Sequence, residues 1–342
     1  MNYRAFNPRP QRGAALVVAM LVFALCTALI VAMKSEFDLY YQRGANGVIS
    51  EQIYAYLRGA EELASLVLVQ DYDEDLLREL PRDDLEELWA QEAVPQSLPE
   101  GGWWWGGLED LQGRFNLNTL EPREGSAEEP QRGRKRFTVA QQQFIRLLNA
   151  LEEVEMSEQD AILITESIGD WLDADGQPRP NGAEDDYYLG KTPAYRAANR
   201  LMSSASELRL VAYMTPEIYD ALLAWVTVLP KTDTRLNILT APPMVLRTIN
   251  ADDTLAPLSV EDGLELEARR KSGEIGSVED FFEHPIFEGK TTTRMKQELG
   301  LSSAYFLLSA QAKVADRTLR LYSVLERRDR SILAISRASG SL

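Results

Sequence analysis

The residues best suited to chemistry lie in one acidic loop, which runs from Asp170 to Tyr188. Six carboxylates fall within 17 residues of this loop, and glycines and prolines interrupt the chain between them. Calcium binds about six to eight oxygen atoms, and the alternation of Asp173, Asp175 and Gln177 around a glycine is typical of a calcium loop. We therefore predict a calcium site with these ligands: Asp173, Asp175, Gln177, Glu184, Asp185 and Asp186.

The loop does not match a standard EF-hand. Counted from Asp173, Glu184 takes the twelfth position, where an EF-hand has its bidentate glutamate. The second acidic position and the glycine do not both fit, and Pro178 and Pro180 break the usual loop. A solvated acidic loop without metal is one alternative. A paired-carboxylate glycosidase is another, but nothing beyond the acids supports it, and we predict that the protein is not an enzyme.

The composition of the chain argues against several kinds of function and site. The chain of 342 residues has 53 acidic and 36 basic side chains and a formal net charge of −17, which disfavours binding to nucleic acid. His284 is the only histidine and Cys26 the only cysteine, so the sequence excludes histidine-rich zinc sites and an intrachain disulfide. Because His284 directly precedes Pro285, we interpret it as a residue at a helix end and not as a catalytic base.

An uncharged apolar segment, residues 14–33, is long enough to cross a membrane as a helix. About 20 residues at ~1.5 Å each span a hydrocarbon core of ~30 Å. Glu36 and Asp38 follow the segment, whereas three arginines and no acid precede it: Arg4, Arg9 and Arg12. The positive-inside rule then predicts an inner-membrane protein with a cytoplasmic N-terminus and a periplasmic body. A cleaved secretory signal would have a shorter apolar part.

The same helix is predicted to continue beyond the membrane. Apolar residues recur at spacings of three and four, as on one stripe of an amphipathic helix: Ile49, Ile53, Leu57, Ala60, Ala64 and Val67. One helix of about 55 residues, about 80 Å long, would then begin in the membrane and end in a folded domain.

An antiparallel sheet is predicted for the end of the chain. Its candidate strands are residues 305–314, 318–326 and 331–336, the first two joined by a hairpin loop at 315–317. We expect Arg114–Asn118, which follows the glycine-flanked Trp103, Trp104 and Trp105, to open the sheet. We interpret the tryptophans as packing anchors, with an exposed binding patch as the alternative.

Residues 138–300 are predicted to form a helical domain inserted into this sheet. Thr215, Thr240 and Ser277 are predicted helix caps, because proline or acidic residues follow them. One helix face comprises Ala161, Ile164, Ile168, Trp171 and Leu172. Residues 235–246 resemble a helix-hairpin-helix or SAM-like unit, but the acids around them would repel phosphate, so we expect packing against protein. We interpret the basic run 132–136 as a solvated loop.

The segment around Gly13 resembles the processing site of type IV prepilins and pseudopilins. Gln11-Arg12-Gly13 directly precedes the apolar run that starts at Ala14. The resemblance implies that a prepilin peptidase removes residues 1–13 and that the new amine of Ala14 is methylated. The fifth residue of the mature chain, usually glutamate in pilins, is Val18, and this departure matches the K-type minor pseudopilins of type II secretion systems.

The resemblance to K-type pseudopilins extends over most of the chain. The loop from Asp170 to Tyr188 resembles theirs, and structures of that family carry calcium. The implied fold class is α+β: a pilin-like fold with a long N-terminal helix and an antiparallel sheet, carrying a large inserted α-helical domain. We divide the chain accordingly into a leader (1–13), a transmembrane part (14–33), a first pilin-like part (34–137), the insert (138–300) and C-terminal strands (301–342).

The resemblance implies a structural assembly protein. It would lie at the tip of a periplasmic pseudopilus and start or cap its assembly with I-type and J-type minor pseudopilins, to drive export of folded proteins across the outer membrane. H-type pseudopilins and secreted proteins are further candidate partners. Val18 fits the tip position, because it cannot make the acid-to-amine contact that a pilin uses toward the subunit ahead. A minor pilin of a type IV pilus is the alternative.

Overall fold

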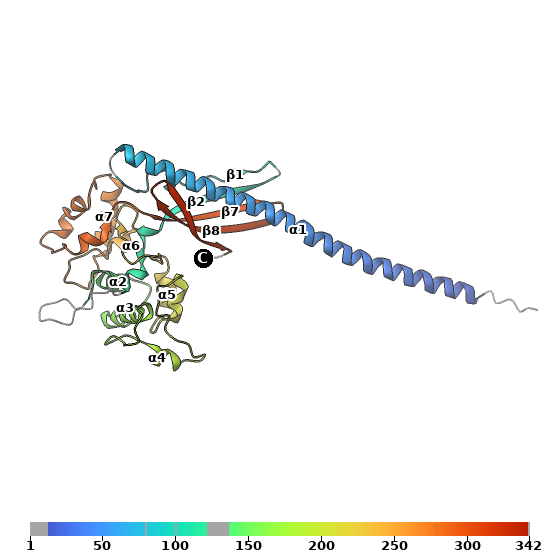
Figure 1. The fold of residues 1–342 in the computed structure, drawn as a ribbon, viewed down its shortest axis with the longest axis horizontal. Coiled ribbons are helices and arrows are strands. Elements are labelled where there is room, and N and C mark those ends of the chain that lie inside the picture. The colour runs from blue at the N-terminus through green and yellow to red at the C-terminus, as the bar shows by residue number, and fades with distance from the viewer. Residues whose placement is uncertain (1–12, 79–80, 100, 122–136, 341–342) are drawn as a thin grey trace, which may run out of the picture.

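The computed structural model describes residues 13–78, 81–99, 101–121 and 137–340. A long helix, α1 (Ala14–Arg78), lies across one face of a five-stranded antiparallel sheet (Figure 1). In sheet order the strands are β1 (Gln96–Ser97), β2 (Gly102–Asp110), β7 (Tyr305–Val314), β8 (Arg317–Arg328) and β9 (Ser331–Ser339). A helical insert, residues 111–304, separates β2 from β7. The predicted α+β class is therefore confirmed.

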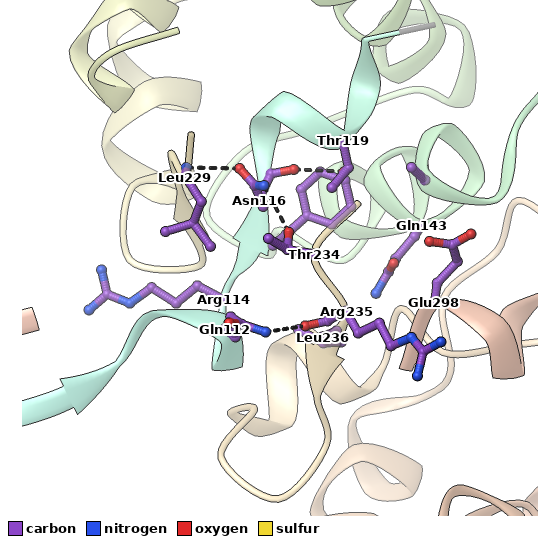
Figure 2. A pocket seen from close by; sticks show the side chains of 12 residues that line it. Gln112, Arg114, Asn116, Thr119, Gln143, Leu229, Thr234, Arg235, Leu236 and Glu298 are labelled. Atoms are coloured by element: carbon purple, nitrogen blue, oxygen red, sulfur yellow. Dashed lines mark hydrogen bonds between the residues drawn. The ribbon is translucent and has the colours of Figure 1, made fainter. Parts of the chain in front are cut away.

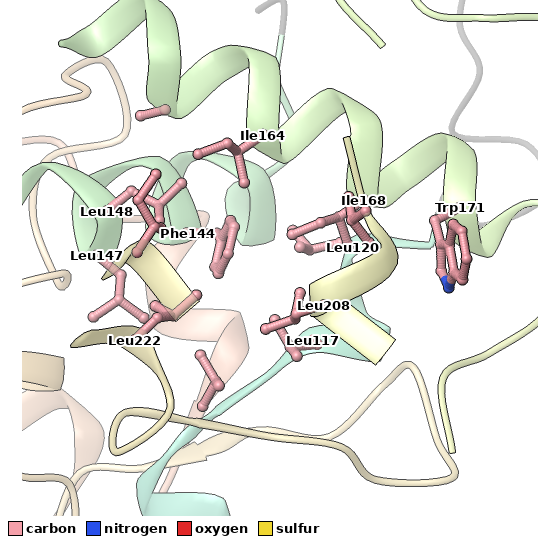
Figure 3. Close-up of a cluster of buried hydrophobic side chains, with 14 of the residues drawn as sticks. Leu117, Leu120, Phe144, Leu147, Leu148, Ile164, Ile168, Trp171, Leu208 and Leu222 are labelled. Atoms are coloured by element: carbon pink, nitrogen blue, oxygen red, sulfur yellow. The ribbon is translucent and has the colours of Figure 1, made fainter. Parts of the chain in front are cut away.

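The insert is built from short helices and two small parallel ladders. Its helices are α2 (Val139–Asn149), α3 (Glu158–Leu172), α4 (Asp185–Leu189), α5 (Pro216–Leu222), α6 (Pro243–Leu246), α7 (Val260–Lys271) and α8 (Val278–Phe282). The ladders pair β3 (Phe115–Asn116) with β4 (Val226–Thr227), and β5 (Leu236–Asn237) with β6 (Leu299–Gly300). The main hydrophobic cluster of the insert begins at Phe115, ahead of the predicted domain boundary at 138 (Figure 3).

Helix α1 has 65 residues and is longer than the predicted 55 or so. Its apolar first part is exposed, and it is the one helix among the described residues that is long and apolar enough to cross a membrane. This is compatible with a single-pass anchor. The extra length lies beyond Val67, where buried Asp71 and Asp75 make polar contacts to Arg327 and to the backbone of Arg82. Apolar periodicity could not reveal helix turns that pack through carboxylates.

The sheet presents alternate residues to α1, as the period of two requires. Phe306, Leu308 and Ala310 of β7 pack with α1 in one hydrophobic cluster. Tyr305 and Leu307 point to the other face, where they pack with Leu111 and Leu229 of the insert. The sheet is thus covered by α1 on one face, and by the insert at only one end of the other face.

The prediction that Arg114–Asn118 opens the sheet is wrong. The strand beside β7 is β2, which contains the three tryptophans, with Trp104 paired to Ala312. Only Phe115 and Asn116 of the predicted segment are extended, and they pair with β4 inside the insert. Aromatic residues favour strands, so the tryptophans themselves were the better strand signal.

Most of the predicted element ends agree with the structure. The hairpin between β7 and β8 is one residue tighter than predicted, because Val314 already pairs with Arg317 across a two-residue turn. Thr215 and Ser277 cap α5 and α8. Thr240 does not cap a helix, since α6 begins three residues later, at Pro243 behind the N-cap Pro242, and the Thr240 hydroxyl donates to Asp110.

His284 lies at the start of a short 3-10 helix, Pro285–Phe287, where its Nδ1 accepts a hydrogen bond from the Ile286 N–H at 3.4 Å. Its Nε2 is 3.3 Å from a carboxylate oxygen of Glu265. These contacts account for both ring nitrogens and agree with the predicted role at a helix end. The basic run 132–136 and the residues before Gly13 lie outside the described residues.

A buried polar junction joins the sheet to the insert. We use this name for Asp83, Asp110, Asn237, Ser303 and Arg327, all of which are less than a tenth exposed. Arg327 donates to both oxygens of Asp83 at 2.6 Å. Asp110 accepts from Ser303 at 2.6 Å and from Asn237 at 3.0 Å, and burial raises the pKa of Asp110 to about 6. Five separate chain segments are therefore fixed at one place.

Glu61 makes the corresponding buried contact between α1 and the sheet. Its carboxylate accepts from Ser323 at 2.6 Å and from Arg337 at 2.8 and 2.9 Å. Burial opposes ionisation of Glu61, but the bonds from Arg337 and Ser323 and the charges of Arg337 and Arg58 outweigh it and lower the pKa below its usual 4.5. Ionised Glu61 therefore stabilises the fold above that pH, and this contribution is lost as the pH falls through the lowered pKa.

We predict that Glu61→Gln lowers the free energy of unfolding by about 2 kcal/mol at pH 7, because the buried Ser323 hydroxyl and the half-exposed Arg337 lose their charged acceptor. The difference from the wild type should shrink as the pH falls below 4.5 and through the lowered pKa of Glu61, because below that pKa Glu61 is protonated in both the folded and the unfolded chain. Denaturant unfolding at several pH values measures this. Glu62→Gln is the control, since Glu62 is 73% exposed. An equal loss of unfolding free energy in both variants would contradict the stabilising role of Glu61.

Candidate metal centre

The acidic loop connects the end of α3 to the start of α4. Ser157 begins α3 with a capping box to Asp160, and the helix ends at Asp173, whose backbone is extended. The chain then turns back and enters α4 at Glu184, which occupies the N-cap position without a side-chain capping bond. The fold thus brings the two ends of the loop together and leaves the Glu184 carboxylate available for another contact.

Three carboxylates meet at this point. One oxygen from each of Asp173, Asp175 and Glu184 lies within 4.8 Å of the others. Asp173 is 8% and Glu184 5% exposed, whereas Asp175 is exposed. Asp173 Oδ1 and both oxygens of Glu184 are buried without a hydrogen-bond partner. Buried carboxylate oxygens without a partner are costly, so this donor set fits a hard divalent cation.

The electrostatics of the group favour a cation as well. Burial raises the pKa of Glu184 to about 7, and the negative charges of Asp170 and Asp173 raise it too. Burial also raises the pKa of Asp170 to about 6, although Arg179 opposes this. Arg179 pairs with Asp170 and lies 2.9 Å from Asp173 Oδ2. One arginine faces four carboxylates, and a divalent cation would balance most of the remaining charge.

The structure brings together three of the six predicted ligands. Gln177 is exposed, and its backbone N–H donates to Asp175 Oδ1 at 2.8 Å. Asp185 accepts from the Ala197 N–H at 3.1 Å and lies 3.3 Å from Arg196, while Asp186 is exposed. These three residues lie outside the carboxylate group formed by Asp173, Asp175 and Glu184.

Three further residues shape the site and were missed in the sequence. Arg179 supplies the internal cation described above. Glu166 holds the loop by accepting from the Asn181 backbone at 2.7 Å and from its side chain at 3.0 Å. A Cβ atom on Gly182 would lie 1.8 Å from Asp170 Oδ2, so only glycine fits there. The sequence did contain one signal for these residues. Glu166 and Asp170 lie four residues apart on the buried side of the apolar helix α3, and buried charges need partners.

Two other places among the described residues differ from this site. Asp71, Asp83 and Glu87 also approach one another within 4.8 Å, but Arg327 pairs with Asp71 and Asp83. Figure 2 shows the side chains that line another cavity, where Gln112 donates to the Arg235 carbonyl and Asn116 bonds to Leu229 and Thr234. The volume of this cavity is about 20 Å³. That volume is enough for about one water molecule, so this cavity is part of the packing within the insert.

Comparisons with known proteins agree over nearly the whole chain. A family model described as "Type II secretion system (T2SS), protein K" matches residues 113–231. Type II secretion system protein K of Pseudomonas aeruginosa is 34% identical over 97% of this chain and 94% of its own length. The Klebsiella pneumoniae protein of the same name is 30% identical over 99% of this chain and 98% of its own.

A solved structure is similar too. A chain of the GspK-GspI-GspJ complex of the type 2 secretion system from enterotoxigenic Escherichia coli superposes with a TM-score of 0.72. Its sequence is 26% identical, and the match covers 88% of this chain and all of that chain.

Proposed function

This chain belongs to the type II secretion system protein K family and is a minor pseudopilin of that system, and we propose that it occupies the tip of the pseudopilus. The observation that carries this proposal is the position of the insert, at the end of the molecule opposite the apolar end of α1 (Figure 1). A further subunit stacked on the end of the molecule that carries the insert would collide with the insert. Val18 in place of an acid fits the same position, because no subunit ahead needs to be contacted.

We propose I-type and J-type pseudopilins as partners. The similar structure is described as a complex of GspK with GspI and GspJ. In this chain the first part of α1 is apolar and exposed, for example at Leu21, Leu25 and Phe37, and apolar helices of neighbouring subunits would cover it. The sheet-facing side of α1 is already occupied from Ile53 onward, so assembly would use the opposite side.

The proposed location is the inner membrane, with the body in the periplasm. Residues 14–33 would form the anchor, with the basic leader on the cytoplasmic side. Helix α1 begins at Ala14, and among the described residues no atom outside its neighbours lies within 4 Å of a Cβ placed on Gly13. A prepilin peptidase would therefore find the bond after Gly13 accessible. We assign the protein a structural role and no catalytic one.

We propose a structural calcium ion at the candidate metal centre. Asp173, Asp175 and Glu184 would hold it, and the ion would supply the positive charge that these carboxylates lack. Its role is to keep the end of α3 and the start of α4 together. Tyr188 of α4 depends on that arrangement, because its ring packs edge-on against Trp171 with centroids 5.3 Å apart.

The tip assignment predicts a stable ternary complex of the full chain with its I-type and J-type partners, in detergent, with one copy of each. Labelled subunits in assembled pseudopili should appear once, at an end. Excess copies should shorten filaments, whereas excess major subunit should lengthen them. Uniform labelling along the filament would rule out the tip assignment.

Processing should leave a mature chain of residues 14–342 with a methylated Ala14 amine. Gly13→Val should block cleavage, because a branched side chain would obstruct the peptidase at that bond. Intact mass spectrometry of the membrane protein measures both results. A mature chain that starts at Met1, or beyond Met33, would refute the processing site.

Chelation should lower the melting temperature and calcium should restore it, with a gain of about 2.7 kcal/mol at a calcium concentration 100 times the Kd. Asp173→Ala with Asp175→Ala should abolish the calcium response. Glu184→Gln should also reduce the response, yet raise the melting temperature in chelator, because it removes a repelled charge. Asp186→Asn is the matched control and should respond like the wild type. The same melting curve with and without chelator would reject the calcium site.

A further inference from the structure

The structure separates the three tryptophans that the sequence places together. Trp104 points toward α1 and packs in the cluster between helix and sheet. Trp103 and Trp105 point to the other face of the sheet, since neighbours along a strand alternate. Both are partly exposed. The Trp105 indole N–H donates to the Ala93 carbonyl at 2.8 Å, and its ring lies over Gly107, within 3.2 Å of a Cβ placed there.

The strand register places further side chains beside these two. Trp105 is opposite Gln311, which is opposite Arg320 on the next strand. Trp103 is opposite Lys313, and Gly107 is opposite Ser309, whose other neighbour is Tyr322. We call the following set the open sheet face: Trp103, Trp105, Gln311, Lys313, Arg320 and Tyr322. The insert covers the far end of this side of the sheet, where Leu229 and Leu307 belong to one cluster. Tyr322 is partly buried against that cluster and borders the open part.

The two cations of the open sheet face lack ionic partners. Neither Lys313 nor Arg320 forms an ion pair or a side-chain hydrogen bond among the described residues, although acids outnumber bases in the chain by 53 to 36. By contrast, four arginines further along the chain all pair with carboxylates: Arg327 and Arg328 of β8, Arg330 of the turn that follows, and Arg337 of β9. Uncompensated cations, one opposite Trp103 and the other two residues before Tyr322 on β8, are suited to carboxylates on another molecule.

The composition of the open sheet face is that of a protein-binding surface. Tryptophan, tyrosine and arginine are the residues most enriched where partner proteins bind tightly. The face is also turned away from α1, whose exposed apolar part serves assembly under the proposed function. A second copy of this chain would carry the same net charge of −17 and would be repelled overall.

We propose that the open sheet face binds an acidic patch on an exported protein. The proposal rests on the proposed function, because assembly through α1 leaves this face pointing away from the other pseudopilins and toward proteins that approach the pseudopilus. Lys313 and Arg320 would pair with carboxylates of the exported protein, and Trp103 and Tyr322 would cover apolar groups between them.

The test uses the full chain in lipid nanodiscs with its I-type and J-type partners, and the folded exported proteins of the same secretion system, purified one by one, as probes. We expect at least one of them to bind, more weakly as salt rises. Lys313→Glu with Arg320→Glu should weaken that binding about tenfold or more, since like charges would then face each other. Trp103→Ala should weaken it as well, without the change in salt dependence.

The matched control is Lys271→Glu with Lys290→Glu, an exposed and a half-buried cation of the insert, which should leave binding unchanged. A photo-reactive residue at Thr318, opposite Lys313, should crosslink to the same exported protein in secreting cells. Binding that survives the charge reversal, absence of binding by every exported protein, or a crosslink to a polysaccharide instead would each overturn the proposal. If exported proteins fail to bind but the ternary complex with the I-type and J-type partners still forms, the tip assignment stands. If the ternary complex does not form either, the proposed function is contradicted.

Discussion

The buried pair between Asp83 and Arg327 is the contact on which the arrangement of the whole head depends. Removing one partner of such a pair costs about 3–5 kcal/mol, because the other charge remains buried. Asp83 follows α1 and Arg327 ends β8, so the pair closes the sheet region onto the helix. Through Ser303 and Asn237 the same contact reaches Asp110 and the insert. The junction therefore holds together the two parts of the head: the insert, which carries the metal centre, and the sheet, which carries the open sheet face.

The sequence predicted the elements whose packing is apolar and periodic. The strands after residue 305 and the stripe of α1 up to Val67 agree with the structure because alternate or every third and fourth residues are apolar. Prediction failed where polar contacts or pairing between distant segments determine which residues form an element. The last turns of α1 pack through Asp71, and Phe115 pairs with Val226, more than a hundred residues away. No local pattern contains that information.

The acidic loop illustrates the same limit at the level of a site. The density of carboxylates identified the loop, and Asp173, Asp175 and Glu184 do come together. Which acids meet depends on how the loop folds back, and that is set by Arg179 and by Glu166 on α3. These two residues act through contacts across 6 to 15 positions of sequence, which spacing alone does not reveal.

Helix α1 can also be considered as a mechanical element. The sheet supports it only from about Asn46 and Ser50, which Arg317 contacts, so the part before them is a cantilever clamped at one end. No proline interrupts its 65 residues, and the free part before Asn46, about 48 Å long, turns a tilt of about 10° at the clamp into a displacement of about 8 Å at its far end. Bending stress in such a beam is greatest at the clamp, and there the chain has Gly44 and Gly47, whose missing side chains make the helix most compliant where the load concentrates.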